Sequence, residues 1–212
     1  MFHIRQQDVL TDLSMLAELR AEFRERHCLL LRNAVDLSLL RQLTVLLADA
    51  PAYERIPGVA RGRIIARERC IDRNSVVARA FTLLFNKTDL FRLVENLTGC
   101  PRIGNFLGRV YMMEPDSEHY DTWHSDNDGN RLIGLSLNLR EAYSGGAFRI
   151  RERQTERIVA EIANTRLGDA HIFRIAPELQ HCVTPVTGNV TKIAYAGWFR
   201  AEPESLKLLT EG

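Results

Sequence analysis

The sequence has few cysteines, and none of them form a close pair. Cys28, Cys70, Cys100 and Cys182 lie far apart in a chain of 212 residues, and no CxxC motif occurs. In a chain of this length the pattern is typical of reduced, buried thiols rather than of a disulfide scaffold. We therefore expect a cytoplasmic protein.

Long apolar runs and an excess of one charge are also missing. No hydrophobic run approaches the ~20 residues that span a bilayer, and the initial segment MFHIRQQDVL is too polar for a signal peptide. The 28 Lys and Arg residues balance 27 Asp and Glu residues, so the formal net charge is +1. Such a balance provides no global field to recruit nucleic acid or an anionic membrane. We expect neither partner, and specificity must come from a local site.

The composition is that of an ordinary globular protein, with 45% hydrophobic and 26% charged residues. The length suits a single domain spanning residues 1–212. Residues 1–100 read as a mostly helical supporting region. Asp36, Ser75 and Asp89 are expected to begin helices, and Gly99 is expected to end the last of them. Short strands are expected at 27–33 and 61–71.

After Pro101 the pattern changes to short strands separated by turn signals such as Asp128–Gly129 and Gly188–Asn189. Strands are expected at about 103–113, 121–126, 131–140, 146–152, 157–163, 168–175, 181–186 and 191–200. Many short strands at regular spacing favour a sandwich, a barrel or a jelly roll over residues 101–200. The overall class is therefore α+β, with the helices of the N-terminal half packed outside the sheet.

Three residues of the β half form a candidate metal site. His124 and Asp126 are two residues apart, so on a strand their side chains point to the same face. His181 begins the segment HCVTPV and is expected on another strand. Two imidazoles and one carboxylate leave the other metal positions open, as in the facial triad of iron(II) oxygenases. The same three ligands are also compatible with zinc, and an HxD pair can occur by chance in an exposed loop.

The surrounding motifs give the triad a context. They are the stretch LSLNLREAYSGGAF, the segment GDAHIF, and HCVTPV followed by a basic residue and WFR. With the HxD pair, in this order and spacing, residues 103–200 resemble the 2-oxoglutarate/iron(II)-dependent oxygenase superfamily, in particular its prolyl-hydroxylase-like branch. The resemblance implies a double-stranded β-helix, a jelly-roll type of fold, with His124, Asp126 and His181 as the iron ligands.

The resemblance also implies a basic anchor for the far carboxylate of 2-oxoglutarate, about ten residues after the distal histidine. Here the eleventh residue, Lys192, fills this position, because the turn TGNVT is one residue longer than usual. Lys192 shares a strand face with Ala194, Ala196 and Trp198, and the small alanines leave room for a ligand. Tyr111 resembles the family tyrosine that hydrogen-bonds the same carboxylate. The alternatives are a solvated lysine and a barrel-wall aromatic.

Further polar residues are candidates for substrate binding. Arg109 shares a strand face with Tyr111, and Ser136 and Asn138 form a polar face opposite an apolar one. Arg149 and Arg200 complete this set. An exposed edge or a solvent-facing strand is the alternative for each of them.

The implied function is an Fe(II)- and 2-oxoglutarate-dependent dioxygenase that uses O₂ and releases succinate and CO₂, with ascorbate as a possible reductant. We expect it to hydroxylate a small molecule or an amino-acid-like substrate, with no catalytic residue beyond the metal site. A cupin-like metalloenzyme without 2-oxoglutarate, a hydroxylase of peptide or protein side chains and a non-catalytic β-barrel module are the alternatives.

Overall fold

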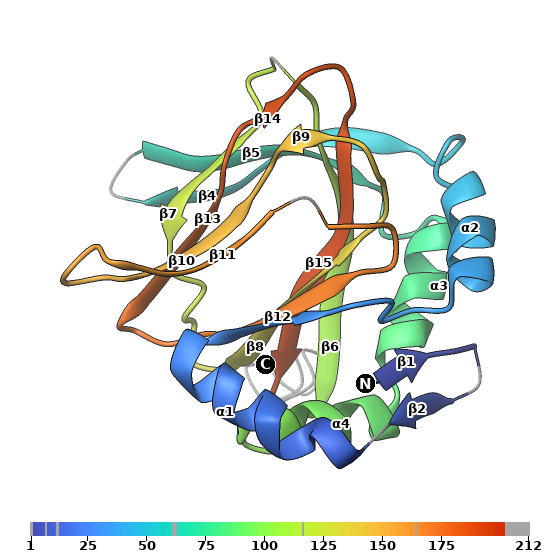
Figure 1. Ribbon diagram of the computed structural model, residues 1–212. Helices are drawn as coiled ribbons and strands as arrows, with labels where there is room; N and C mark the ends of the chain where they lie inside the picture. The colour runs from blue at the N-terminus through green and yellow to red at the C-terminus, as the bar shows by residue number, and fades with distance from the viewer. Residues whose placement is uncertain are drawn as a thin grey trace, which may run out of the picture.

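The computed structural model describes residues 2–6, 8–11, 13–60, 63–115, 117–163 and 165–201. Its main feature is an eleven-stranded antiparallel sheet that curls into a nearly closed barrel (Figure 1). The four α-helices of the described chain lie outside this barrel. This is the α+β, double-stranded β-helix architecture predicted from the sequence. No helix among the described residues has the length and apolar character needed to cross a membrane.

The elements follow one another in this order: β1 (Phe2–Ile4), β2 (Val9–Thr11), η1 (Leu13–Met15), α1 (Leu16–Arg26), β3 (Cys28–Leu31), α2 (Leu37–Val45), β4 (Ala52–Ala60), β5 (Arg63–Ile71), α3 (Val76–Phe85), α4 (Thr88–Thr98), β6 (Asn105–Met113), β7 (Tyr120–His124), β8 (Arg131–Asn138), β9 (Ser144–Gly145), β10 (Phe148–Glu152), β11 (Ile158–Ile162), β12 (Ala170–Arg174), β13 (Leu179–Val183), β14 (Val186–Thr187) and β15 (Lys192–Arg200). The main sheet has the order β11-β10-β13-β7-β5-β6-β15-β8-β12-β3, and β4 pairs with β5 outside this path.

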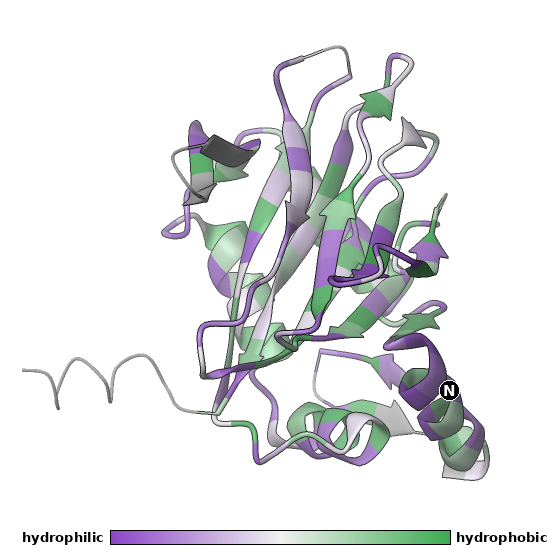
Figure 2. Cartoon of the chain, turned by 90° about the vertical axis from the view of Figure 1, so that its left-hand side faces the viewer, coloured by the Kyte–Doolittle hydropathy of each residue, from purple (hydrophilic) through white to green (hydrophobic). Residues whose placement is uncertain are grey.

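The strands predicted for the C-terminal half are confirmed, because each of the eight segments overlaps one of β6, β7, β8, β10, β11, β12, β13 and β15. Hydrophobic and hydrophilic residues alternate along many of these strands (Figure 2). In β8, Ile133, Leu135 and Leu137 belong to the hydrophobic core, whereas Ser136 faces the barrel interior and lines a cavity. Both faces of β8 are buried, which explains why its polar face is not a solvent face.

The helix boundaries follow local capping chemistry. The Asp36 carboxylate accepts a hydrogen bond from the Leu39 amide at 2.8 Å, and the Ser75 hydroxyl accepts one from the Ala78 amide at 3.3 Å. Gly99 ends α4 in the left-handed conformation with φ of 70°. The predicted start at Asp89 is wrong: α4 begins at Thr88, and Asp89 lies in the first turn, where its negative charge favours the helix dipole.

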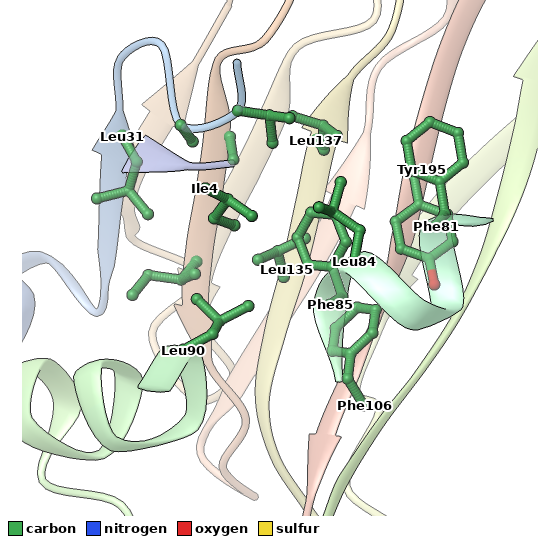
Figure 3. Close-up of a cluster of buried hydrophobic side chains, with 14 of the residues drawn as sticks. Ile4, Leu31, Phe81, Leu84, Phe85, Leu90, Phe106, Leu135, Leu137 and Tyr195 are labelled. Carbon is green, nitrogen blue, oxygen red and sulfur yellow. The ribbon is translucent and has the colours of Figure 1, made fainter. Parts of the chain in front are cut away.

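The helices attach to the outer face of the sheet through one hydrophobic cluster. Phe81 and Phe85 of α3 point toward Phe106 of β6 and Tyr195 of β15 (Figure 3). The rings of Phe81 and Tyr195 stack with a centroid distance of 4.8 Å, and all four side chains are almost fully buried. This packing fills the outer face with hydrocarbon, so the polar inner face of the barrel is left for a ligand.

The description of residues 1–100 as mostly helical needs correction. β3 pairs with β12, and β5 enters the main sheet between β7 and β6, with β4 beside it as a hairpin partner. The strand expected at 61–71 is found as β5, although its first two positions lie outside the described residues. β4 was hidden by its charged residues and by Pro57–Gly58, near which the register shifts. The first half therefore contributes to the barrel wall as well as to its support.

Candidate metal centre

The structure brings His124, Asp126 and His181 together. His124 is the last residue of β7, and it lies opposite His181 of β13 in the strand register. The Nε2 atoms of His124 and His181 lie 3.7 and 3.3 Å from the two carboxylate oxygens of Asp126. One potential ligand atom from each residue falls within 4.8 Å of the others. Asp126 lies beyond the end of β7, so the loop and not a shared strand face brings it to the histidines.

Neighbouring groups orient the imidazole of His124. Its Nδ1 donates a hydrogen bond to the Thr122 carbonyl oxygen at 2.7 Å and lies 3.1 Å from a carboxylate oxygen of Asp121. The Nδ1 proton therefore faces away from the site, and Nε2 is left as the ligand atom. Such outer contacts fix the tautomer and raise the basicity of a metal-binding histidine.

Asp126 is also held in place on both oxygens. The Trp198 indole Nε1 donates a hydrogen bond to Oδ2 at 2.6 Å, and the Arg131 guanidinium donates to Oδ1 at 3.1 Å. Arg131 lies over the Trp198 ring, 3.8 Å from its centroid, and also pairs with Asp128 at 2.8 Å. Arg131 thus pairs with both carboxylates, but of the two only Asp126 lies within reach of the two histidines as a candidate ligand.

The pKa values of His124 and Asp126 indicate that the site favours positive charge. Burial lowers the pKa of His124, but the Asp121 and Asp126 carboxylates and the Thr122 carbonyl outweigh burial and raise this pKa to about 9. Burial raises the pKa of Asp126, but His181, His124 and the Trp198 indole hold it well below its usual range. A divalent metal ion that binds here would displace the proton of His124 beside an Asp126 carboxylate that is already ionised.

A cavity of about 150 Å³ opens beside the triad. Its walls come from nine strands, β4 to β8, β10, β12, β13 and β15, and from the loop after β7, and they include the apolar rings of Phe148 and Phe173. Lys192 lies in the same cavity, with Tyr111 and Ser136. The metal ligands and the predicted cosubstrate residues thus share one enclosed space.

Lys192 is a cation that is almost fully buried in the wall of this cavity. Its side chain is only 4% exposed, and its Nζ donates a hydrogen bond to the Gly146 carbonyl oxygen at 2.5 Å. No carboxylate pairs with it directly among the described residues, although the more distant Asp121 favours its charged form. Burial lowers its pKa to about 8. The ammonium is therefore a buried charge that an anionic ligand would stabilise.

Tyr111 and His171 lie near Lys192. Burial, together with the charge of Glu68, raises the pKa of the Tyr111 phenol, so it remains a neutral donor. His171 pairs with Ser136 in the strand register and is 7% exposed. Burial and the charges of Lys192 and His181 lower the pKa of His171 to about 3, so its ring is neutral. Its Nε2 has no hydrogen-bond partner in the part of the chain that the structure describes.

Of the five residues predicted to bind substrate, two line the cavity beside the triad and three do not. Arg109 and Ser136 line the cavity beside the triad. The Asn138 amide donates to the carbonyl oxygens of Arg140 and Thr165, both at 2.8 Å, and this residue lies beside a smaller space behind Lys192. Arg149 pairs with Glu161 across β10 and β11 at 2.5 Å. Arg200 donates to Asn130 at 3.0 Å, and neither of these two arginines lines the cavity.

Several residues of the site are absent from the sequence-based set. They are Asp121, Arg131, Trp198 and His171 of the β half, and Arg55 and Glu68 of the β4–β5 hairpin. The sequence offered a signal for Trp198, which shares a strand face with Lys192, and for Asp121, which lies on the same strand as His124. The hairpin residues offered none, because no local pattern places β5 beside β7.

The fold and the site define a class. The barrel brings two imidazoles and one carboxylate to the wall of a cavity, an arrangement that could hold a metal ion in the manner of a non-haem facial triad. A family model described as the 2OG-Fe(II) oxygenase superfamily matches residues 109–200. This part of the chain is similar to that superfamily of oxygenases, and the resemblance predicted from the sequence is confirmed.

Solved structures with the same fold include an oxidoreductase of the 2OG-Fe(II) oxygenase family from Burkholderia pseudomallei, with a TM-score of 0.65 and 18% identity over 90% of this chain and 93% of that one. A prolyl-4-hydroxylase from Pseudomonas putida has a TM-score of 0.63 and 16% identity over 88% and 99%. A Trichoplax adhaerens prolyl hydroxylase, in complex with a peptide fragment of the hypoxia inducible factor oxygen degradation domain, has a TM-score of 0.62 and 15% identity over 92% of both chains. No curated protein sequence matches significantly.

Proposed function

We propose that this protein is an Fe(II)- and 2-oxoglutarate-dependent dioxygenase that hydroxylates a small molecule and releases succinate and CO₂. The observation that carries the proposal is the buried Lys192 ammonium in the cavity that also holds the His124–Asp126–His181 triad. A dianion with a metal-chelating end and a distal carboxylate fits these two features together. A cupin-like metalloenzyme without such a cosubstrate would not need a buried lysine at this place.

The donor set fits iron(II). Two neutral imidazole nitrogens and one carboxylate oxygen are the ligands of non-haem iron(II) oxygenases, and they leave open positions for cosubstrate and dioxygen. When bound, iron(II) supplies the activation of dioxygen, and 2-oxoglutarate supplies the additional two electrons through its oxidative decarboxylation.

The chain's own residues bind and orient the reactants. We assign the distal carboxylate of 2-oxoglutarate to Lys192 and the Tyr111 hydroxyl, which offer a charged and a neutral donor. Trp198 and Arg131 hold the Asp126 carboxylate, so the metal position is defined before the metal binds. The rings of Phe148 and Phe173 make the adjoining wall apolar, which keeps water away from the reacting centre.

The test uses the whole protein and measures binding and turnover separately. We expect 2-oxoglutarate to bind with Mn(II) present but only weakly without metal, as measured by isothermal titration calorimetry. With Fe(II) and ascorbate in air, slow succinate formation is expected even without substrate. Absence of both metal-dependent 2-oxoglutarate binding and succinate formation would rule out this function. We further propose a cytoplasmic location, which fractionation of the native host tests.

The position of His171 predicts a contribution to the affinity for 2-oxoglutarate, at its distal carboxylate. Its neutral ring has an unpartnered Nε2 beside Lys192, which can donate a hydrogen bond to the distal carboxylate. A hydrogen bond to a charged group contributes about 1.5–3 kcal/mol, so His171→Phe should weaken 2-oxoglutarate binding about tenfold or more. His171→Asn keeps a donor and should lose less. Calorimetry with Mn(II) measures both, and equal affinities in all three proteins would contradict this role.

A further inference from the structure

Three strands bring an Arg–Glu–Arg cluster to the wall of the metal cavity. Glu68 of β5 accepts a hydrogen bond from the Arg109 Nε at 2.6 Å and another from Arg55 at 3.0 Å, both on its Oε1. Arg55 lies opposite Glu68 in the hairpin register, and all three residues line the cavity. Glu68 is only 7% exposed. Two guanidinium groups therefore share one buried carboxylate.

The charges around the cavity show an excess of cations. Among the described residues, the cationic side chains that line it are Arg55, Arg67, Arg109, Arg131 and Lys192, and the carboxylates are Glu68, Asp121 and Asp126. Binding of iron(II) and of dianionic 2-oxoglutarate, as proposed above, adds equal and opposite charges. The excess of positive charge therefore persists in the loaded enzyme and is available to a substrate.

The excess is located at the Arg–Glu–Arg cluster. Arg131 pairs with Asp126 and Asp128, and Arg67 pairs with Glu118 at the exposed rim. Lys192 is assigned to the cosubstrate. Arg55 and Arg109 have Glu68 in common, so one guanidinium charge in this cluster lacks its own carboxylate.

The cluster is also connected to the metal site. The Arg109 guanidinium lies 5.4 Å from the centroid of the Trp198 ring, and the Trp198 indole donates to the ligand Asp126. An anionic group held by Arg109 would thus place the remainder of a small molecule next to the metal. Glu68 orients the Arg109 guanidinium through their hydrogen bond, and although burial lowers the pKa of Arg109, the Glu68 carboxylate raises it.

Building on the proposed function, we propose that the substrate is a small molecule with one carboxylate, which Arg109 and Arg55 bind beside the metal. A guanidinium can bind a carboxylate through two parallel hydrogen bonds, which adds directional specificity to the charge. A single negative charge matches the one uncompensated guanidinium, whereas a phosphate monoester would bring nearly two. The carboxylate would fix which C–H bond faces the metal.

The experiment compares matched carboxylates and amides on protein saturated with Mn(II) and 2-oxoglutarate. Propionate and benzoate are titrated against propionamide and benzamide by calorimetry or ligand-observed NMR. Each pair has nearly the same shape, so a difference reports the charge. We expect the carboxylates to bind about tenfold or more tightly than their amides, as a charge-assisted hydrogen bond provides. Equal binding within each pair, on protein that binds 2-oxoglutarate normally, would overturn the substrate class but not the proposed function.

Two variants at the cluster should act in opposite directions. Arg109→Met should remove the preference for carboxylates, whereas Glu68→Gln, which leaves two guanidinium groups without a carboxylate, should strengthen it. Arg149→Met is the matched control, because this arginine lies outside the cavity and should change nothing. If Arg109 and Glu68 act only as a structural ion-pair network, both variants will lower the melting temperature and neither will change the preference. Arg55→Gln, at a more exposed position, replaces Arg109→Met if that variant does not fold.

Discussion

Replacement of His181 by alanine is expected to abolish metal-dependent succinate formation. The change removes one of three candidate ligands whose atoms lie within 4.8 Å of one another, and the two that remain should hold the metal ion much less firmly. Since loss of an outer contact alone typically costs about 10–100-fold in metal affinity, loss of a ligand should cost at least about 100-fold. Mn(II) binding measured by electron paramagnetic resonance reports the loss directly, independently of turnover.

Two histidine variants make this result specific. His3→Ala removes a histidine that contacts the Asn33 carbonyl far from the cavity, and it should leave Mn(II) affinity unchanged. His171→Phe, in the cavity but outside the triad, should bind the metal normally while binding 2-oxoglutarate weakly. If His181→Ala binds Mn(II) as tightly as the unaltered protein, the triad is not the metal site.

Replacement of Lys192 by methionine is expected to weaken 2-oxoglutarate binding by about 10–100-fold, which corresponds to the loss of a hydrogen bond to a charged group. The same change should increase the stability of the ligand-free protein. Burial lowers the Lys192 pKa to about 8 from 10.5, so the charged form opposes folding below pH 8. Removing the charge should therefore raise the free energy of unfolding at neutral pH by roughly 1–3 kcal/mol. Urea denaturation measures this gain.

The pKa of Lys192 also predicts a pH dependence. Only the ammonium form binds the distal carboxylate. In the ligand-free protein, Lys192 loses its proton as the pH rises above about 8. The affinity for 2-oxoglutarate should therefore fall as the pH rises above about 8, by at most about tenfold per pH unit. Lys192→Met should show no such fall. A loss of both affinity and stability in Lys192→Met would instead indicate that the lysine holds the Gly146 loop in place.

The sequence allowed the C-terminal strands to be predicted because their two faces differ chemically. In β8 the leucines pack under the helices, whereas Ser136 faces the cavity, so the alternation is visible in one short segment. The candidate metal ligands were predicted from the HxD pair and the later His181 together with the surrounding motifs, because spacing alone left the triad open. Asp126 was predicted from a strand face shared with His124. This reason is wrong, because Asp126 lies beyond the end of β7.

The hairpin of β4 and β5 could not be predicted in the same way. Arg55 and Glu68 face the cavity, but in the sequence they look like the charged face of a solvent-exposed strand. Glu68 also pairs with Arg109, which is 41 residues away along the chain. Contacts of this kind are set by strand pairing between distant segments, and no local pattern reports them.

The order of the strands has a consequence for how the protein reaches its native state. β3 pairs with β12, about 140 residues later in the chain. β5 pairs with both β6 and β7, which also follow it in the chain. Such distant pairings close large loops before any contact compensates for the lost entropy, so folding is slow compared with helical proteins of similar size. The metal ligands meet only after β13 has joined β7. The proposed ligands, iron(II) and 2-oxoglutarate, would therefore bind only the completed barrel, and by mass action they would reduce the fraction of molecules that reopen.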